Sequence, residues 1–298
     1  MTKTISNIDR RRLMATILSS GLAMPLVAGS THAATKPSAQ QPSDLRNPLL
    51  WAVAWSETAA EFGALCHQAF NLATWRVDQA KETHRTSNRP LAVITDLDNT
   101  ILHASSYWGY LIRQGIDFFD DSIWDQWVPE NLVTLVPGAF EFLKHCEMNE
   151  VEVFYVTNRN QGPKTFEYAL AQLQRLNLPY ANASHLTVYQ ETSDKTPSRR
   201  AVDQTHELIL LLGDNLNDFK RDYYVSDVNK RYELMERDKS ELGKKFIILP
   251  NATDGHWVRA IFGESEPAAT EENRRLLLSA ATRQAWDGKP TQNRHELR

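Results

Sequence analysis

Two aspartates separated by one residue, Asp96 and Asp98, directly follow the apolar run Leu91–Thr95. Side chains at alternate positions of an extended segment project to the same side, so we expect the two carboxylates to be neighbours. Neighbouring carboxylates repel each other, and the repulsion raises the pKa of one of them. A divalent cation beside one carboxylate would relieve the repulsion and leave the other free to transfer a proton. For an isolated Asp-x-Asp pair, the alternative is a solvated turn with local hydrogen bonds.

Three further polar groups follow or precede similar apolar runs. Thr157 and Asn158 offer a hydroxyl and backbone amides that can hold phosphoryl oxygens. Lys195 lies just before a proline-started helix and can place a positive charge on a phosphate. Asp214 follows a buried run, with Asp218 four residues later, and carboxylate ligands of this kind suit Mg²⁺. Taken singly, these residues are equally typical of ordinary turns, a surface lysine and a helix N-terminus.

Short apolar runs alternate with helix-like stretches over most of the chain, and this alternation predicts an α/β fold with a mostly parallel sheet flanked by helices. The carboxyl ends of parallel strands lie at one edge of a sheet, where ligands bind, so the polar groups above are expected to converge there. The predicted strands are 91–96, 151–157, 185–189, 208–214 and 245–250, and the predicted helices are 138–146, 164–176, 198–204, 218–239, 254–262 and 271–284.

The chain divides into four predicted parts. Residues 1–33 have the three-part layout of a secretory signal, and Arg10–Arg12 followed by Leu13 and Met14 are typical of the twin-arginine export type. Residues 34–47 read as a linker. Residues 48–265 are predicted to form the main α/β domain, which begins with one or two amphipathic helices and includes a small cap. Residues 266–298 form a C-terminal helix and tail.

Composition narrows the class of protein. Hydrophobic residues make up 42% and charged residues 23%, as in an ordinary globular domain. A net charge of −4 without a dense basic stripe argues against nucleic-acid binding. The apolar stretch of the signal is about 17 weakly hydrophobic residues, short for a membrane span. We therefore expect cleavage near Ala33 and Ala34 and a periplasmic or secreted product without a membrane anchor; an uncleaved anchor is the alternative. The sequence is compatible with a monomer or a homodimer.

The four polar groups, in this order, resemble the motifs of the haloacid dehalogenase (HAD) superfamily of phosphohydrolases. A closer resemblance is to the bacterial class C acid phosphatases, several of which act as 5′-nucleotidases. It rests on five segments and covers about 51–262. The chain departs from the family pattern at Asn99, where Glu is usual. The segments are 96–98 (Asp-Leu-Asp), 136–139 (Val-Pro-Gly-Ala), 157–159 (Thr-Asn-Arg), Lys195 with the arginines after it, and 213–219 (Gly-Asp-Asn-Leu-Asn-Asp-Phe).

The resemblance implies a metal-dependent phosphomonoesterase that works through an aspartyl-phosphate. Asp96 would be the nucleophile, and Asp98 would protonate the leaving group and then activate water. One Mg²⁺ would lie between the Asp96 carboxylate, the Asp98 backbone carbonyl and Asp214. Asp218 would be a ligand through water or a partner of the ligands. Two alternatives stay open, namely a phosphotransferase of the same superfamily and a non-catalytic periplasmic binding protein on the same fold.

Thr157, the Asn158 backbone and Lys195 would hold the phosphoryl oxygens in the transition state. About 60 residues separate the first two motifs, more than a strand connection needs, and this stretch is rich in aromatic side chains. We expect it to form the cap, with Trp124 or Trp127 stacking on a nucleobase or phenyl ring of a small phosphomonoester; burial in the core is the alternative.

His103, five residues after Asp98, is a weaker candidate for the cleft. Cys66 and Cys146 are either buried thiols or a disulfide.

Overall fold

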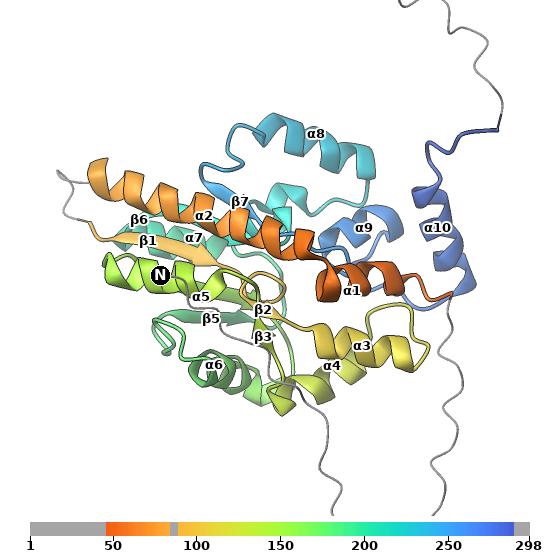
Figure 1. Cartoon of the computed structure of the whole chain (residues 1–298), viewed down its shortest axis with the longest axis horizontal. Coiled ribbons are helices and arrows are strands. Elements are labelled where there is room, and N and C mark those ends of the chain that lie inside the picture. Colours follow the sequence, from red (N-terminus) through yellow and green to blue (C-terminus); the bar gives the residue numbers. More distant parts are fainter. Residues whose placement is uncertain (1–45, 84–88, 289–298) are drawn as a thin grey trace, which may run out of the picture. The chain divides into compact units, whose positions relative to one another are not determined.

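Five parallel strands form the central sheet, in the order β5-β4-β1-β6-β7 (Figure 1). The structure is a computed structural model that describes residues 46–83 and 89–288. The predicted signal and most of the predicted linker lie outside these residues. The prediction of an α/β fold with a mostly parallel sheet is confirmed. The strands are β1 (Leu91–Thr95), β4 (Glu152–Asn158), β5 (Leu186–Tyr189), β6 (Glu207–Gly213) and β7 (Phe246–Ile248).

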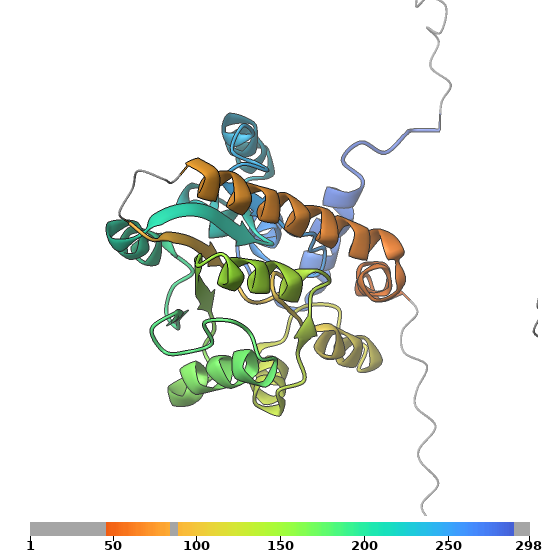
Figure 2. The same ribbon diagram turned by 60° about the vertical axis from the view of Figure 1, so that its left-hand side comes forward.

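The central strand β1 is buried on both sides, and its alternate side chains serve two cores. Leu91 and Val93 belong to a large core under the helices α2 (Ala60–Thr83), α5 (Ala139–Met148) and α6 (Thr165–Arg175). Ala92 and Ile94 belong to a smaller core beneath α7 (Thr196–Thr205). Figures 1 and 2 show α2 and α5 side by side along the sheet. This two-sided burial explains why β1 reads as an uninterrupted apolar run.

An insertion between β1 and α5 forms the cap region. It is bracketed by the antiparallel pair β2 (Leu102–His103) and β3 (Thr134–Leu135), and it contains α3 (Ser105–Arg113), α4 (Asp121–Trp127) and a 3₁₀ turn, Val128–Glu130. Fully buried Tyr107 ties the insertion together: its hydroxyl accepts a hydrogen bond from Asp120 N (2.9 Å) and donates one to Asp120 O (3.0 Å). The Tyr107 ring also contacts the rings of Trp108, Phe119, Trp124 and Trp127, so these aromatic side chains of the cap pack against one another.

The predicted helix 218–239 is wrong over its first half. The α-helix there, α8, spans Val228–Asp238, and two 3₁₀ turns precede it, Leu216–Asp218 and Arg221–Tyr223. The side chain of Asp227 accepts a hydrogen bond from Lys230 N (2.7 Å) and so caps α8. Such a cap competes with continuing the helix through residue 227.

The remaining helices lie at the ends of the described chain. They are α1 (Leu49–Thr58), α9 (His256–Phe262) and α10 (Glu271–Ala281). Asn47, in the predicted linker, is buried and donates to Ile116 O (2.8 Å), so ordered structure begins before residue 48. Among the described residues, no helix is both long and apolar enough to cross a membrane. Cys66 and Cys146 are buried free thiols rather than a disulfide, and burial raises the pKa of Cys66 to about 11.

The carboxylate of Asp238, at the end of α8, is held by three side chains. Its oxygens lie 2.9 Å from Lys220 Nζ and 3.1 Å from both Arg237 Nε and the Tyr223 hydroxyl. The hydrogen bond from Arg237, with those from Lys220 and Tyr223, outweighs burial and lowers the pKa of Asp238 to about 2. A carboxylate with a depressed folded-state pKa stabilises the fold above its unfolded pKa and loses that contribution as the pH falls through the folded value.

We expect Asp238→Asn to lower the free energy of unfolding by about 1–2 kcal/mol at about pH 7, and the difference from wild type to shrink between about pH 4 and pH 2. Urea unfolding across this pH range measures it. Asp222→Asn is the matched control, because Asp222 also pairs with Arg237 (3.1 Å) but is 57% exposed. An exposed pair should change stability by less than about 1 kcal/mol. A loss that is equally large at every pH would contradict the electrostatic account.

Candidate active site

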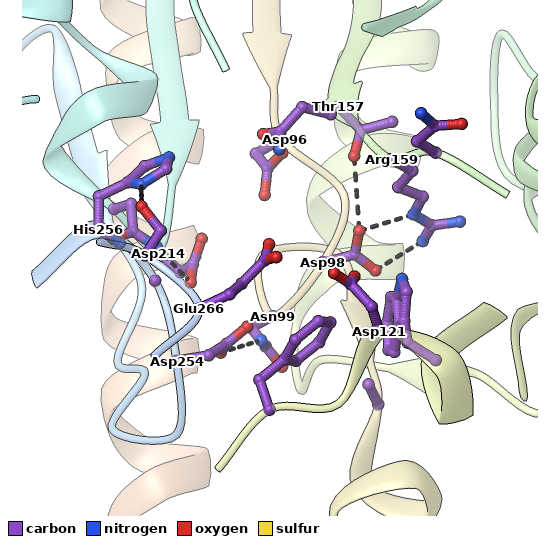
Figure 3. A pocket seen from close by; sticks show the side chains of 18 of the residues that line it. Asp96, Asp98, Asn99, Asp121, Thr157, Arg159, Asp214, Asp254, His256 and Glu266 are labelled. Atoms are coloured by element: carbon purple, nitrogen blue, oxygen red, sulfur yellow. Dashed lines mark hydrogen bonds and ion pairs between the residues drawn. The ribbon is translucent and has the colours of Figure 1, made fainter. Parts of the chain in front are cut away.

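A cavity of about 430 Å³ opens at the carboxyl ends of β1, β4 and β6. Each strand delivers polar residues to it, as predicted from the apolar runs: Asp96 and Asp98 after β1, Thr157 and Asn158 at the end of β4, and Asp214 after β6. The cap helix α4 and the segments before and after α9 complete its wall (Figure 3). The tertiary structure thus brings together residues more than a hundred positions apart.

Three carboxylates lie closest together at the floor of this cavity. Asp96, Asp214 and Asp218 each offer one oxygen, and these oxygens lie within 4.8 Å of one another. The Lys195 ammonium contacts Asp96 Oδ1 and lies 2.7 Å from Asp218 Oδ1. When all three carboxylates are ionised, they and the Lys195 ammonium have a formal charge of −2, which a divalent cation would balance. Hard oxygen donors of this kind fit Mg²⁺.

The protonation of this cluster reflects its burial. Burial raises the pKa of Asp96, and the charges of Asp218 and Asp98 raise it further against the opposing effect of Lys195. Burial and the charges of Asp218 and Asp96 likewise raise the pKa of Asp214 well above its usual value. Burial disfavours the Lys195 charge, but Asp218 and Asp96 outweigh it and raise the pKa of Lys195. The paired carboxylates therefore favour the charged form of Lys195, and positive charge near the floor favours the ionised form of Asp96 and Asp214.

Local backbone geometry sets the positions of these side chains. Asp96 N donates to Leu212 O of β6 (3.0 Å), which extends the β1–β6 pairing by one residue. Asn99 adopts a left-handed conformation (φ 56°), which asparagine tolerates, and the chain turns back there. At Gly213 a Cβ would lie 2.3 Å from Asp218 Oδ2, so only glycine lets that carboxylate fold back against the end of β6.

The carboxylate of Asp98 turns away from the other three and pairs with Arg159. Arg159 donates from Nε to Asp98 Oδ2 (2.7 Å) and from Nη2 to Asp98 Oδ1 (2.6 Å), while Thr157 Oγ1 lies 3.4 Å from Oδ2 (Figure 3). Arg159 also donates to Gln172 Oε1 (2.7 Å), and its guanidinium carbon lies 6.0 Å from the Trp124 ring centroid. The Asp98 side chain is thus held between β4 and the cap.

A second layer of side chains orients Asp214. Asn251 Nδ2 lies 2.6 Å from Asp214 Oδ2, and Asn215 Nδ2 lies 3.0 Å from the same oxygen. Asn251 and Asn99 both donate to Asp254 Oδ1, at 2.7 and 3.0 Å. Gly255 (φ 109°) permits a close approach, since a Cβ there would lie 2.2 Å from Asn215 Nδ2.

Some predicted site residues lie elsewhere than expected. Lys195 does reach the site, where it contacts Asp96 and Asp218, but it is only 3% exposed and lies beneath the residues that line the cavity. Trp124 and Trp127 are both buried in the large core, which was the alternative to stacking on a substrate. Trp124 has an edge on the cavity, whereas Trp127 stacks on Trp124 (5.1 Å between centroids) and donates from Nε1 to Ser106 Oγ (3.0 Å). His103 also lies outside the cavity lining and stacks on Phe62 of α2 (5.5 Å).

Sequence reasoning assigned no role to several residues of the cavity wall. Arg159 belongs to the Thr-Asn-Arg motif, but its pairing with Asp98 forms only when β1 and β4 lie side by side in the sheet. Asp254 and His256 come from the segment around the start of α9, and Glu266 falls in the part predicted to be a separate C-terminal extension. No local motif marks these residues.

Comparison with known proteins agrees with this geometry. Residues 19–257 match the family model described as HAD superfamily, subfamily IIIB (acid phosphatase). The structure is similar to that of the class C acid phosphatase from Bacillus anthracis, with a TM-score of 0.71 and 28% identity over 78% of this chain and 96% of that one. The tungstate-bound class C acid phosphatase from Bacillus anthracis is similar to the same degree, with a TM-score of 0.71 and 28% identity over 79% of this chain and 97% of that one. The chain therefore belongs to the HAD superfamily, subfamily IIIB, and is an acid phosphatase of the class C type.

Proposed function

We propose that this acid phosphatase is a divalent-metal-dependent phosphomonoesterase that hydrolyses small phosphate esters through an aspartyl-phosphate on Asp96. The observation that carries the proposal is the cluster of Asp96, Asp214 and Asp218 on the cavity floor, with a net charge of −2 after Lys195 is counted. A dianionic phosphate cannot approach such a cluster unless a cation is bound there.

The metal would be held by the carboxylates of Asp96 and Asp214 and the backbone carbonyl of Asp98, with Asp218 as a direct or water-mediated partner. When bound, it would neutralise the repulsion between the nucleophile and the phosphate. Asn251 and Asn215 fix the orientation of Asp214, as residues behind a metal ligand commonly do. We favour Mg²⁺ because all these donors are oxygens.

In the first step, a carboxylate oxygen of Asp96 attacks phosphorus and the P–O bond to the alcohol breaks. The departing alkoxide takes a proton from Asp98, which then removes a proton from the water that hydrolyses the acyl phosphate. Both oxygens of Asp98 accept hydrogen bonds from Arg159, so acid catalysis requires the carboxyl group to turn partly away from Arg159 toward the ester oxygen. Thr157, the backbone amide of Asn158 and Lys195 would hold the phosphoryl oxygens.

The wall beyond the phosphate position supports substrates with an apolar or flat leaving group. Trp124, Phe119 and Trp108 all line the cavity, and Phe119 lies 5.7 Å from Trp124 and 6.1 Å from Trp108 between ring centroids. A nucleobase or phenyl ring that stacks there gains about 1–3 kcal/mol. We therefore keep nucleoside monophosphates and aryl phosphates as candidate substrates. Trp124 and Trp108 are buried, and Trp127 and Arg159 already cover the Trp124 ring, so the half-buried Phe119 would make this contact.

We also propose export through the twin-arginine route, on the strength of the N-terminal sequence alone. Replacement of Arg10 and Arg11 by lysine, followed by cell fractionation, tests this part separately from the chemistry.

Asp96→Asn should abolish turnover of p-nitrophenyl phosphate, because an amide cannot form the acyl phosphate. Asp203→Asn, an exposed position on α7, is the control and should keep wild-type activity. The measurements are phosphate release and mass spectrometry of acid-quenched protein, with thermal melting as the check on folding. A phosphorylated adduct should form in the wild type and be missing in Asp96→Asn. Transfer to an added alcohol in place of phosphate release would point to a phosphotransferase.

Asp98→Asn should slow the first step by about 10²–10⁴-fold for esters of weakly acidic alcohols, because their alkoxides need a proton. Esters with acidic leaving groups, such as dinitrophenyl phosphate, should be affected much less. Single-turnover phosphorylation with a series of leaving groups measures this. An equal loss across the series would show that Asp98 acts in some other way.

Exhaustive chelation should remove activity, and Mg²⁺ should restore it. Asp214→Asn should raise the metal concentration needed for half-maximal activity by about 10–100-fold, since it removes a ligand charge. Titration of activity with Mg²⁺ measures both effects, and Asn251→Ala, which removes a hydrogen bond to Asp214, should show a smaller shift. Full activity after chelation would leave the carboxylate cluster unexplained and rule out the metal.

A further inference from the structure

A second cavity lies between α8, α9 and α10, where α9 packs against both of the other helices (Figure 1). It has a volume of about 320 Å³ and shares no lining residue with the cavity of the candidate active site. Its wall is mainly apolar and includes Leu216, Met235, Ile261 and Ala280. Pockets that bind small molecules typically have this size and this kind of lining.

One buried positive charge lies on this otherwise apolar wall. Arg231, on α8, lines the cavity and is only 7% exposed. Within the described ranges 46–83 and 89–288, two other basic side chains are as deeply buried, Arg159 and Lys195, and each of them contacts a carboxylate. Arg231 forms no ion pair with a carboxylate of these residues. A buried guanidinium without a counter-ion is unfavourable, so the cavity favours a negatively charged occupant.

The contacts of Arg231 hold its guanidinium in place without neutralising it. Nη1 donates to Asn217 Oδ1 (2.8 Å) and to the carbonyl oxygen of Tyr223, and both acceptors are uncharged. Nε and Nη2 donate to no acceptor in the described part of the chain, so they remain available to a ligand. Burial lowers the pKa of Arg231 to about 10, against the opposing effects of Tyr223 and Asp218, and the group is still charged at neutral pH.

A second polar group of the wall is also unpaired, and it comes from a different helix. Nε1 of Trp257, on α9, is buried and donates to no acceptor among the residues that the structure describes. Buried N–H groups normally donate to a protein group, a water molecule or a ligand. The exposed Arg283 adds a second positive charge at the cavity, and none of the described residues that line it is acidic. The donors and the charges of this wall therefore all favour an anion.

We propose that this cavity binds an amphipathic carboxylate, that is, a small molecule with one carboxylate group and an apolar body, such as a medium-chain fatty acid. The carboxylate pairs with Arg231, because a planar guanidinium matches its two oxygens. The apolar body lies against Met235, Ile261 and Ala280. One buried guanidinium balances one negative charge, which favours a carboxylate over a doubly charged phosphate. The site is separate from the catalytic cavity, so the inference goes beyond the proposed function.

The test measures binding of octanoate to the purified protein at neutral pH by isothermal titration calorimetry. Octanol and octylammonium are the matched probes, since they have the same chain with no charge or the opposite charge. Octanoate should bind with a Kd below about 1 mM, and the other two should bind at least about tenfold more weakly.

Two variants of neighbouring residues on α8 test the role of the buried charge. Arg231→Met keeps an unbranched apolar side chain but removes the charge, so it should weaken octanoate binding at least about tenfold and leave octanol binding unchanged. Lys230→Met is the matched control: it removes the same charge one residue away, at an exposed position outside the cavity lining, and should keep the wild-type affinity.

A second pair of variants tests the place of binding and leaves Arg231 intact, in case Arg231→Met does not fold. Ala280→Phe fills the cavity from α10 and should abolish octanoate binding. Ala281→Phe adds the same ring at the next residue, which is exposed and outside the cavity lining, and should bind octanoate like the wild type. Thermal melting checks that each variant is folded.

Four outcomes would overturn the inference. Absence of octanoate binding would do so directly, and equal affinity for octanoate and octanol would show that the guanidinium plays no part. Binding that survives Ala280→Phe would place the site elsewhere, and a loss shared by Lys230→Met would show an effect of overall charge. Turnover of p-nitrophenyl phosphate, measured on the same samples, reports on the proposed function separately.

Discussion

The buried ammonium of Lys195 is the interaction on which the arrangement of the site depends. It joins Asp96, at the end of β1, to Asp218, in the turn after β6, from a position at the start of α7. An unpaired charge at 3% exposure would cost several kcal/mol, so the three groups stabilise the fold only when all are in place. Asp218 in turn accepts a hydrogen bond from Asn215 N (3.0 Å), which fixes the turn that carries Asp214.

Lys195 also sets the charge of the cavity floor. It contacts Asp96 and Asp218, so the floor has a formal charge of −2 rather than −3 when all three carboxylates are ionised. Asp218 and Asp96 raise the pKa of Lys195 against the effect of burial, which favours its charged form. The negative charge that remains suits one divalent cation.

Arg159 is the second interaction that links distant elements. Arg159 pairs with Asp98 and also donates a hydrogen bond to Gln172, and Gln172 Nε2 donates to Val128 O in the 3₁₀ turn of the cap (3.1 Å). The guanidinium of Arg159 also lies over the Trp124 ring. Lys195 and Arg159 are thus both paired with carboxylates of the site.

The sequence by itself determined the sheet, the strand ends and the identity of the polar groups there. A strand buried on both sides must be apolar throughout, and it can change to Asp only where it leaves the core, so Asp96, Thr157 and Asp214 were readable as strand-end residues. The helix predicted over 218–239 was wrong in its first half because the Asp227 cap is a local interaction that helical periodicity does not reveal.

Only the tertiary structure decided which groups face the cavity. Lys195 turned beneath it, Trp127 packed behind Trp124, and Glu266 joined the wall from a segment predicted to lie apart. Spacing along the chain fixes the side of a strand on which a residue lies, but it does not fix which distant side chains neutralise or cover that residue, since those contacts are made only when the layers pack.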